Sequence, residues 1–171
     1  MDDRIDALLE DIEAADSAAQ AHARRGEFGD EIAGQAAERT LLERLRGSLG
    51  STVQVMLSDR DVTGTACFLG RDIVVLAGVE VSAIAISAVR RLRLTTRVHR
   101  FESGGLERLG MGSALRRWSA AHEEVSIDTV DHSGGIRGRC SLVAADYVEI
   151  AGRIIPFAAI SAVHARTNPF E

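Results

Sequence analysis

Few residues in this 171-residue chain have the types and spacing that catalysis requires. Asp131, His132 and Ser133 contain the residue types of a catalytic triad, but the side chains of neighbours in a turn point apart. Gly110 and Gly112 open a helical stretch in the manner of a phosphate loop, without the third glycine and the preceding strand. We interpret this segment as a linker followed by a helix start. No residue set has the pattern of acid–base or covalent catalysis, so we expect no enzyme.

Metal ligation is not indicated either. The five histidines are scattered, with no pair four residues apart: His22, His99, His122, His132 and His164. Cys67 and Cys140 form no Cys-x-x-Cys spacing and fit small buried hydrophobic residues of a reducing compartment. We therefore expect no metal site, no cofactor and no disulfide.

Arginine is the only strongly basic residue type in the chain, and it clusters. Residues 90–117 carry a net charge of +6, whereas residues 1–40 carry −7. Guanidinium groups bind phosphates and aromatic rings stack on bases. The candidate nucleic-acid contacts are Arg90, Arg91, Arg93, Arg97, Arg100, Arg116, Arg117 and Trp118. The alternative, which we favour, is that these arginines pair with the acidic head.

The acidic head, residues 1–40, has apolar side chains at helical spacing: Ile5, Leu8, Leu9 and Ile12. Such a stripe packs within the chain, on another copy or on a different protein. We expect a partner surface here, for self-association or for an unidentified protein. The head lacks the order of a signal peptide, and no apolar run approaches the length of a membrane span. A cytoplasmic protein without membrane partners is expected.

A twenty-residue pattern occurs twice, as "GRDIVVLAGVEVSAIAISAV" from Gly70 and "AADYVEIAGRIIPFAAISAV" from Ala144. Residues 62–89 align with residues 136–163 without a gap, so the chain contains an internal duplication. Two extra residues lie in the first turn of the second copy, 131–135 against 59–61, and we expect the largest local difference there.

Each copy predicts five short strands after a helix. Apolar residues alternate in "TVQVML" and "EVSIDTV", as in half-buried strands. Gly64 and Gly138 sit inside the second strands and indicate a bulge or sharp bend. "ISAVRRL" and "ISAVHA" supply the fifth strands. The first helix includes "ERTLLERLRGSLG" and ends at Gly50, and the second begins at Ser113 as N-cap, with Leu115, Trp118 and Ala121 facing inward. The predicted core comprises Val53, Val55, Val74, Ile86, Val89, Val125, Ile127, Val148, Ile160 and Val163.

This order resembles the Sm-like fold, in which a helix precedes five strongly bent strands. The resemblance covers residues 41–93 and 113–165 and rests on the mid-strand glycines, the Asp-containing third strands and the Ile-Ser-Ala-Val endings. It implies a mainly β protein with N-terminal helices and two tandem Sm-like five-stranded bent barrels, each preceded by a helix. The expected domains are the head (1–40), repeat 1 (41–93), an Arg/Gly-rich linker (94–112) and repeat 2 (113–171). The whole layout is similar to an actinobacterial family of tandem Sm-like (LSm-type) proteins.

The resemblance also bears on function. Sm-like RNA sites use an Asp and an Asn before the third strand and a basic-glycine motif near the fifth. Asp72 and Asp146 match, but the Asn and the glycine are missing, so we interpret both aspartates as turn residues. Sm-like barrels leave their fourth and fifth strands as pairing edges, which favours self-association. We therefore expect a non-catalytic interaction protein, with a nucleic-acid-binding regulator as the alternative.

Overall fold

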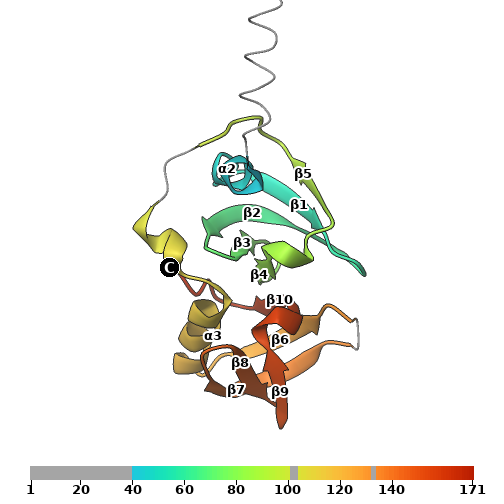
Figure 1. The fold of residues 1–171 in the computed structure, drawn as a ribbon, viewed down its shortest axis with the longest axis vertical. Helices are drawn as coiled ribbons and strands as arrows, with labels where there is room; N and C mark the ends of the chain where they lie inside the picture. Colours follow the sequence, from blue (N-terminus) through green and yellow to red (C-terminus); the bar gives the residue numbers. More distant parts are fainter. Residues whose placement is uncertain (1–39, 101–103, 132–133) are drawn as a thin grey trace, which may run out of the picture. The chain divides into compact units, whose positions relative to one another are not determined.

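The computed structural model describes residues 40–100, 104–131 and 134–171 (Figure 1). These residues are mainly β, with ten strands and few helices. The acidic head, including its predicted partner-binding residues Ile5, Leu8, Leu9 and Ile12, lies outside the described residues, as do His132 and Ser133.

The first repeat contains one α-helix and five strands. They are α2 (Leu41–Arg46), β1 (Thr52–Met56), β2 (Asp61–Leu69), β3 (Ile73–Ala77), β4 (Val81–Ala85) and β5 (Arg91–Leu94), with the 3₁₀ helix η1 (Ile86–Ala88) before β5. The linker contains a further 3₁₀ helix, η2 (Gly105–Arg108).

The second repeat has the same order of elements. They are α3 (Met111–Ala120), β6 (Glu124–Thr129), β7 (Ile136–Val143), β8 (Tyr147–Ile150), β9 (Arg153–Pro156) and β10 (Ile160–Ala165), with the 3₁₀ helix η3 (Phe157–Ala159) before β10.

All ten strands form one open antiparallel sheet, in the order β5-β1-β2-β3-β4-β10-β6-β7-β8-β9. Within each repeat the fifth strand lies beside the first, and the fourth strand ends the series. The repeats join where β4 pairs with β10, the fourth strand of one with the fifth of the other (Figure 1). The described part of the sheet therefore ends at β5 on one side and at β9 on the other.

The long second strands have irregularities at equivalent positions. The register of β2 on β3 shifts between Ala66 and Phe68, and that of β7 on β8 shifts between Cys140 and Leu142. Each irregularity lies just after the mid-strand glycine that predicted it. Gly64 has a different role, because a Cβ there would lie 2.7 Å from the carbonyl oxygen of Ala77, so only glycine permits this close approach of β2 and β3.

The two repeats differ by three residues between equivalent residue pairs of their third and fourth strands. Leu76 lies opposite Ser82 across residues 77–81, whereas Ile150 lies opposite Arg153 across Ala151 and Gly152 alone. Ala151 and Gly152 have φ of 50° and 72°, as a two-residue hairpin of the primed type requires. The gap-free alignment of the sequence copies is therefore wrong beyond this turn.

The Ile-Ser-Ala-Val endings are consequently not equivalent. Residues 86–88 form η1, whereas Ile160 begins β10. The N–H of Ile86 donates to the carbonyl of Asp72 at 2.8 Å, and the corresponding bond in repeat 2 runs from Phe157 to the carbonyl of Asp146 at 2.7 Å. Ile86 thus corresponds to Phe157, and the short turn of repeat 2 causes the offset.

The second helix begins earlier than predicted. Its N-cap is Gly110, and Ser113 lies in its first turn, where the Ser113 hydroxyl accepts the Gly110 N–H at 3.5 Å. Asp72 supplies the cap from the first repeat, since its Oδ1 accepts the N–H of Met111 at 3.0 Å. Leu115 and Trp118 are buried as predicted.

One inward-facing prediction for the second helix is wrong, because Ala121 follows α3 and is exposed. In α2 only Leu45 is buried, and Leu41 is 45% exposed.

The core follows the strand alternation. Eight of the ten predicted core residues are buried: Val53, Val55, Val74, Val125, Ile127, Val148, Ile160 and Val163. Ile86 and Val89 are only half-buried, because they lie in η1 and the segment after it rather than in the fifth strand. Both residues were predicted to be buried from the gap-free alignment, which the three-residue offset makes wrong at these positions.

Candidate functional site at the junction of the repeats

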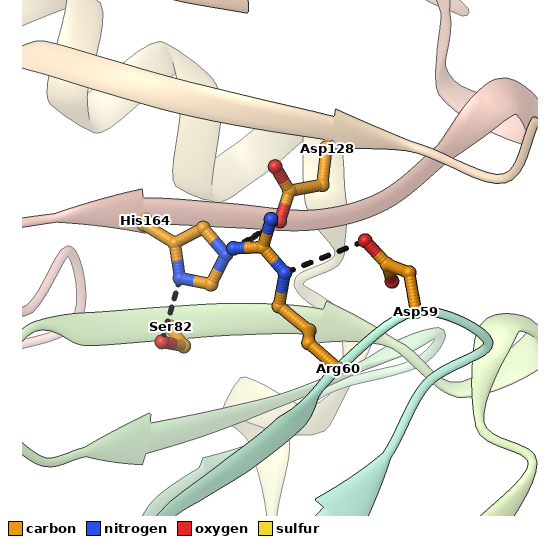
Figure 2. A network of polar contacts seen from close by, with 5 residues as sticks. All are labelled: Asp59, Arg60, Ser82, Asp128 and His164. Carbon is orange, nitrogen blue, oxygen red and sulfur yellow. Dashed lines mark hydrogen bonds and ion pairs between the residues drawn. The ribbon is translucent and has the colours of Figure 1, made fainter. Parts of the chain in front are cut away.

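A chain of polar side chains crosses the junction between β4 and β10 (Figure 2). The Ser82 hydroxyl lies 2.9 Å from Nδ1 of His164, and Nε2 of His164 lies 2.9 Å from Oδ2 of Asp128. A guanidinium nitrogen of Arg60 lies 3.1 Å from the same Asp128 oxygen. Asp59 pairs with Arg60 at 3.5 Å. The chain thus runs from a strand of repeat 1, through two strands of repeat 2, to a turn of repeat 1.

Strand register places these residues together. His164 on β10 lies opposite Ser82 on β4 and opposite Ser126 on β6. Directly opposite residues share a face of the sheet, and Asp128 follows two residues after Ser126 on that face. The turn between β1 and β2 brings Arg60 over the carboxylate. All four groups therefore meet only when the two repeats are paired in this register.

The order Ser–His–Asp resembles the hydrogen-bond chain of a nucleophilic triad, so its accessibility matters. Ser82 is 4% exposed and lies in a strand that is paired on both sides. Asp128 is 5% and His164 9% exposed. Both ring nitrogens of His164 already have partners. A substrate cannot approach the Ser82 hydroxyl in this arrangement, and what the chain provides is satisfied polar contacts across the junction.

A hollow of about 560 Å³ lies beside this chain, with His164 in its wall. Its lining carries both signs of charge, including Arg60 and Glu80 from repeat 1 and Glu123, Arg137 and Arg139 from repeat 2. Arg137 pairs with Glu124. This mixture favours no single class of charged ligand.

Glu123 binds the segment that follows β10. Its carboxylate accepts the backbone N–H groups of Arg166 and Thr167 at 2.7 and 2.9 Å, together with the Thr167 hydroxyl. Burial alone would raise the pKa of Glu123, but these hydrogen bonds lower it below its usual range. Beyond this point Phe170 stacks on Phe68 of β2, with ring centroids 3.9 Å apart. The segment after β10 therefore adds a further contact between the repeats.

The predicted arginine stretch is solvent-facing. Exposed side chains include Arg90, Arg91, Arg93, Arg97, Arg100, Arg116 and Arg117. Arg91 and Arg93 lie on one face of the edge strand β5 and have no acidic partner among the described residues. Arg117 is held by the carbonyl of Pro169 at 2.9 Å and lies over the Phe170 ring. Whether the others meet the acidic head falls outside the described residues.

Trp118 does not belong to the candidate nucleic-acid surface. It is 1% exposed, and its indole N–H donates to the carbonyl of Thr167 at 2.9 Å. Trp118 is a core residue of α3 and cannot stack on a base. Asp72 likewise caps α3, while Asp146 is exposed at the corresponding turn.

The cysteines and metal-binding residue types offer no alternative centre within residues 40–100, 104–131 and 134–171. Burial raises the pKa of both Cys67 and Cys140, so the reactive thiolate is disfavoured. No group of three His, Cys, Asp or Glu in these ranges could hold a metal ion. None of the helices described is long and apolar enough to cross a membrane.

The junction residues were missed by sequence reasoning. Ser82, Asp128 and His164 are far apart in the chain and have no local motif spacing. The one available signal is a carboxylate and an imidazole within otherwise apolar strand patterns, "EVSIDTV" and "ISAVHA". Compared with known proteins, the chain matches no protein-family model and no curated sequence.

Proposed function

We propose that this chain is a non-catalytic interaction protein, a scaffold built on two paired Sm-like barrels with the helical head as its docking or assembly element. The observation that carries the proposal is the pairing of β4 with β10. It joins the fourth strand of one five-stranded unit to the fifth strand of the next, the edges by which such barrels associate. A buried polar chain and the Phe68–Phe170 stack reinforce it.

The proposed docking element is the apolar stripe of Ile5, Leu8, Leu9 and Ile12. Its partner is a second copy of the chain or another protein. A scaffold of this kind needs a rigid body and a separate attachment segment. The ten-stranded sheet supplies the former, since all its central strands are paired on both sides.

Capture of partners by the tagged full-length chain from native lysate, with and without nuclease, tests this proposal. We expect a nuclease-resistant protein that is recovered by the wild-type chain and lost with Leu8→Asp. A matched Glu10→Gln variant should retain the partner. Recovery of nucleic acid alone, or capture that Leu8→Asp leaves intact, would contradict the docking role of the head.

The alternative function, a nucleic-acid-binding regulator, is favoured by one observation: the exposure of the arginines at and after β5. If it holds, affinity for single strands should fall with salt, with a log–log slope of about −0.7 per phosphate contact. We expect no binding by the intact chain at physiological ionic strength, because its net charge is −5. Tight, salt-sensitive binding that is reduced by Arg91→Gln and Arg93→Gln would support the regulator and contradict the scaffold function.

A further inference from the structure

The outer edge strands, β5 and β9, are equivalent to the strands that pair at the junction, β10 and β4. They carry different side chains at the positions of the polar chain. Strand register gives the equivalences. Val55 lies opposite Leu92 in repeat 1, as Ile127 lies opposite Val163 in repeat 2, so Arg93 of β5 corresponds to His164 of β10. Leu76 lies opposite Ser82, as Ile150 lies opposite Arg153. Arg153 of β9 therefore corresponds to Ser82 of β4.

Pairing β5 of one chain with β9 of another, in the register of the inner junction, would place two cations together. Arg93 would lie directly opposite Arg153, at the position where His164 and Ser82 share a hydrogen bond. Side chains directly opposite each other in an antiparallel pair have Cβ atoms about 4.5–5.5 Å apart, and like charges there are destabilising. Met56 takes the position of Asp128, so the carboxylate that bonds His164 at the inner junction has no counterpart at that position.

Two further replacements act in the same direction. Glu149 on β8 occupies the position of Val75 on β3, and Val75 is fully buried. Burying an unpaired carboxylate there would be costly. Pro156, at the end of the four-residue β9, stands where β4 has Ala85. Short edge strands, proline and outward charges are the devices by which natural sheets avoid edge-to-edge association.

Exposed apolar side chains near the β9 edge would favour association rather than prevent it. Leu142 and Ile154 are 45% and 66% exposed and flank Glu149 in one cross-strand row. The corresponding row at the inner junction, Phe68, Val75 and Ala83, is buried. The carboxylate in the middle of the outer row therefore keeps it from serving as a second copy of the inner surface.

We propose that Ser82, His164 and Asp128 are the pairing-specificity residues of the inner junction, and that Arg93, Arg153 and Glu149 prevent the two outer edges from joining copies of the chain in the same way. The inference stands on the strand register and goes beyond the proposed scaffold function, since it holds whatever the head binds. This proposal replaces the expectation that the free strand edges drive self-association. Any self-association would instead involve the acidic head.

Transplanting the inner residues to the outer edges tests this proposal. The full-length variant Met56→Asp, Arg93→His, Arg153→Ser, Glu149→Val recreates the inner chemistry at both outer edges, on β5 with its neighbour β1 and on β9 with its neighbour β8. We expect its mass by light scattering to become a whole multiple of the wild-type mass in the same buffer, in a concentration-dependent manner. Glu149→Val alone, which adds apolar surface but keeps both arginines, should stay at the wild-type mass. A fourfold variant that is folded by circular dichroism yet keeps the wild-type mass would overturn the proposal.

A cross-linking measurement on nearly native chains covers the case in which the fourfold variant does not fold. In the register of the inner junction, Leu92 would face Ile154 of another copy, as Val163 faces Ala83 within the chain. Leu92→Cys with Ile154→Cys, in a chain with Cys67 and Cys140 replaced by Ser, should give no intermolecular disulfide. Val163→Cys with Ala83→Cys should give an intramolecular one, because opposed strand residues meet disulfide geometry. Efficient dimer or ladder formation by the first pair would refute the block at the outer edges. Failure of the head to capture a partner would leave both results unaffected.

Discussion

His164 is the residue on which the junction depends most. It is the central member of a chain in which each polar group has a partner, and two of its contacts cross from one repeat or strand to another. Hydrogen bonds contribute modestly when made, but a buried group left without its partner carries the full cost of desolvation. Removal of the imidazole would leave the Ser82 hydroxyl buried and would reduce Asp128 to its contact with Arg60.

We expect His164→Ala to lower the free energy of unfolding by about 1–3 kcal/mol. Ser126→Ala is the matched control, because Ser126 lies opposite His164 on β6 but is only half-buried. It should change stability by less than about 0.5 kcal/mol. Chemical denaturation measures both. Equal effects of the two substitutions would mean that the polar chain does not hold the junction.

Ile160 and Ile86 provide a second comparison at this scale. They occupy the same place in the sequence repeat, yet Ile160 is 1% exposed at the start of β10, while Ile86 is half-buried in η1. Ile160→Ala should cost about 2–5 kcal/mol, through lost transfer energy and a cavity. Ile86→Ala should cost clearly less. If both variants lose the same free energy of unfolding in chemical denaturation, the gap-free alignment would be supported and the three-residue offset contradicted.

Sequence reasoning predicted apolar core positions well and the polar junction not at all. Val53, Val55, Val125 and Ile127 could be assigned because strand alternation is local. Ser82, Asp128 and His164 could not, because their proximity depends on which strands of different repeats pair. Trp118 received two incompatible predictions: helical periodicity placed its ring in the core, whereas its arginine neighbours suggested stacking on bases. The ring is 1% exposed, so the first prediction is confirmed and the second is wrong.

At the scale of elements, helix α3 is capped from the other repeat. Asp72, in the turn before β3, accepts the N–H of Met111 in the first turn of α3. Asp72→Ala should therefore cost about 0.5–2 kcal/mol, as the loss of an N-terminal cap does. Asp146→Ala, at the corresponding and exposed position of repeat 2, serves as the control and should be nearly neutral. Thermal or chemical unfolding separates them, and a larger loss for Asp146→Ala would disprove the capping role.

The contact between α2 and η2 gives the fold a dependence on pH. Arg46 donates two hydrogen bonds of 2.7 Å to the Glu107 carboxylate. These bonds lower the pKa of Glu107 below its usual range, against the opposing effect of burial. A carboxyl group whose pKa is lower in the folded state stabilises the fold above its unfolded pKa, about 4.3, and loses that contribution as the pH falls through the folded pKa.

Glu107→Gln should thus reduce stability by about 0.5–1 kcal/mol at neutral pH, and its difference from the wild type should vanish in acid below the folded pKa. Glu80→Gln, in the exposed turn before β4, should show no such pH-dependent difference. Unfolding curves collected from neutral to acidic pH measure both. A Glu107→Gln difference that is constant across this range would show that the ion pair contributes nothing.

Element boundaries could be predicted only approximately. Helix α2 ends at Arg46, four residues before its predicted end at Gly50, and Gly50 has a φ of 78° in the turn that follows. The Ala-Gly pair at the end of each third strand is identical in the two sequence copies, but only Ala151 and Gly152 form a two-residue turn, whereas Ala77 still belongs to β3. Because the residues that follow still match in the sequence, the three-residue offset is invisible without strand register.

At the scale of the whole molecule, the duplication is the feature that the sequence conveyed most directly. Two copies of five strands in the same order follow from it, and the single sheet follows from the β4–β10 pairing. The pairing itself could not be derived, because a repeat does not say whether its copies associate with each other or with other chains. The replacements at the outer edges become meaningful only once the register is known.

Amide hydrogen exchange of the full-length protein tests the central claim. According to this claim, the pairing of β4 with β10 joins the two repeats into one sheet, and the end strands β5 and β9 do not pair with another copy of the chain. Strands β4 and β10 have neighbours on both sides, whereas β5 and β9 have one each among the described strands. Amides of β4 and β10 should exchange only through global unfolding, and about half of those of β5 and β9 should exchange far faster, because in an edge strand alternate N–H groups point away from the neighbouring strand. Fast exchange in β4 and β10, or protection of β5 and β9 equal to theirs, would contradict the account.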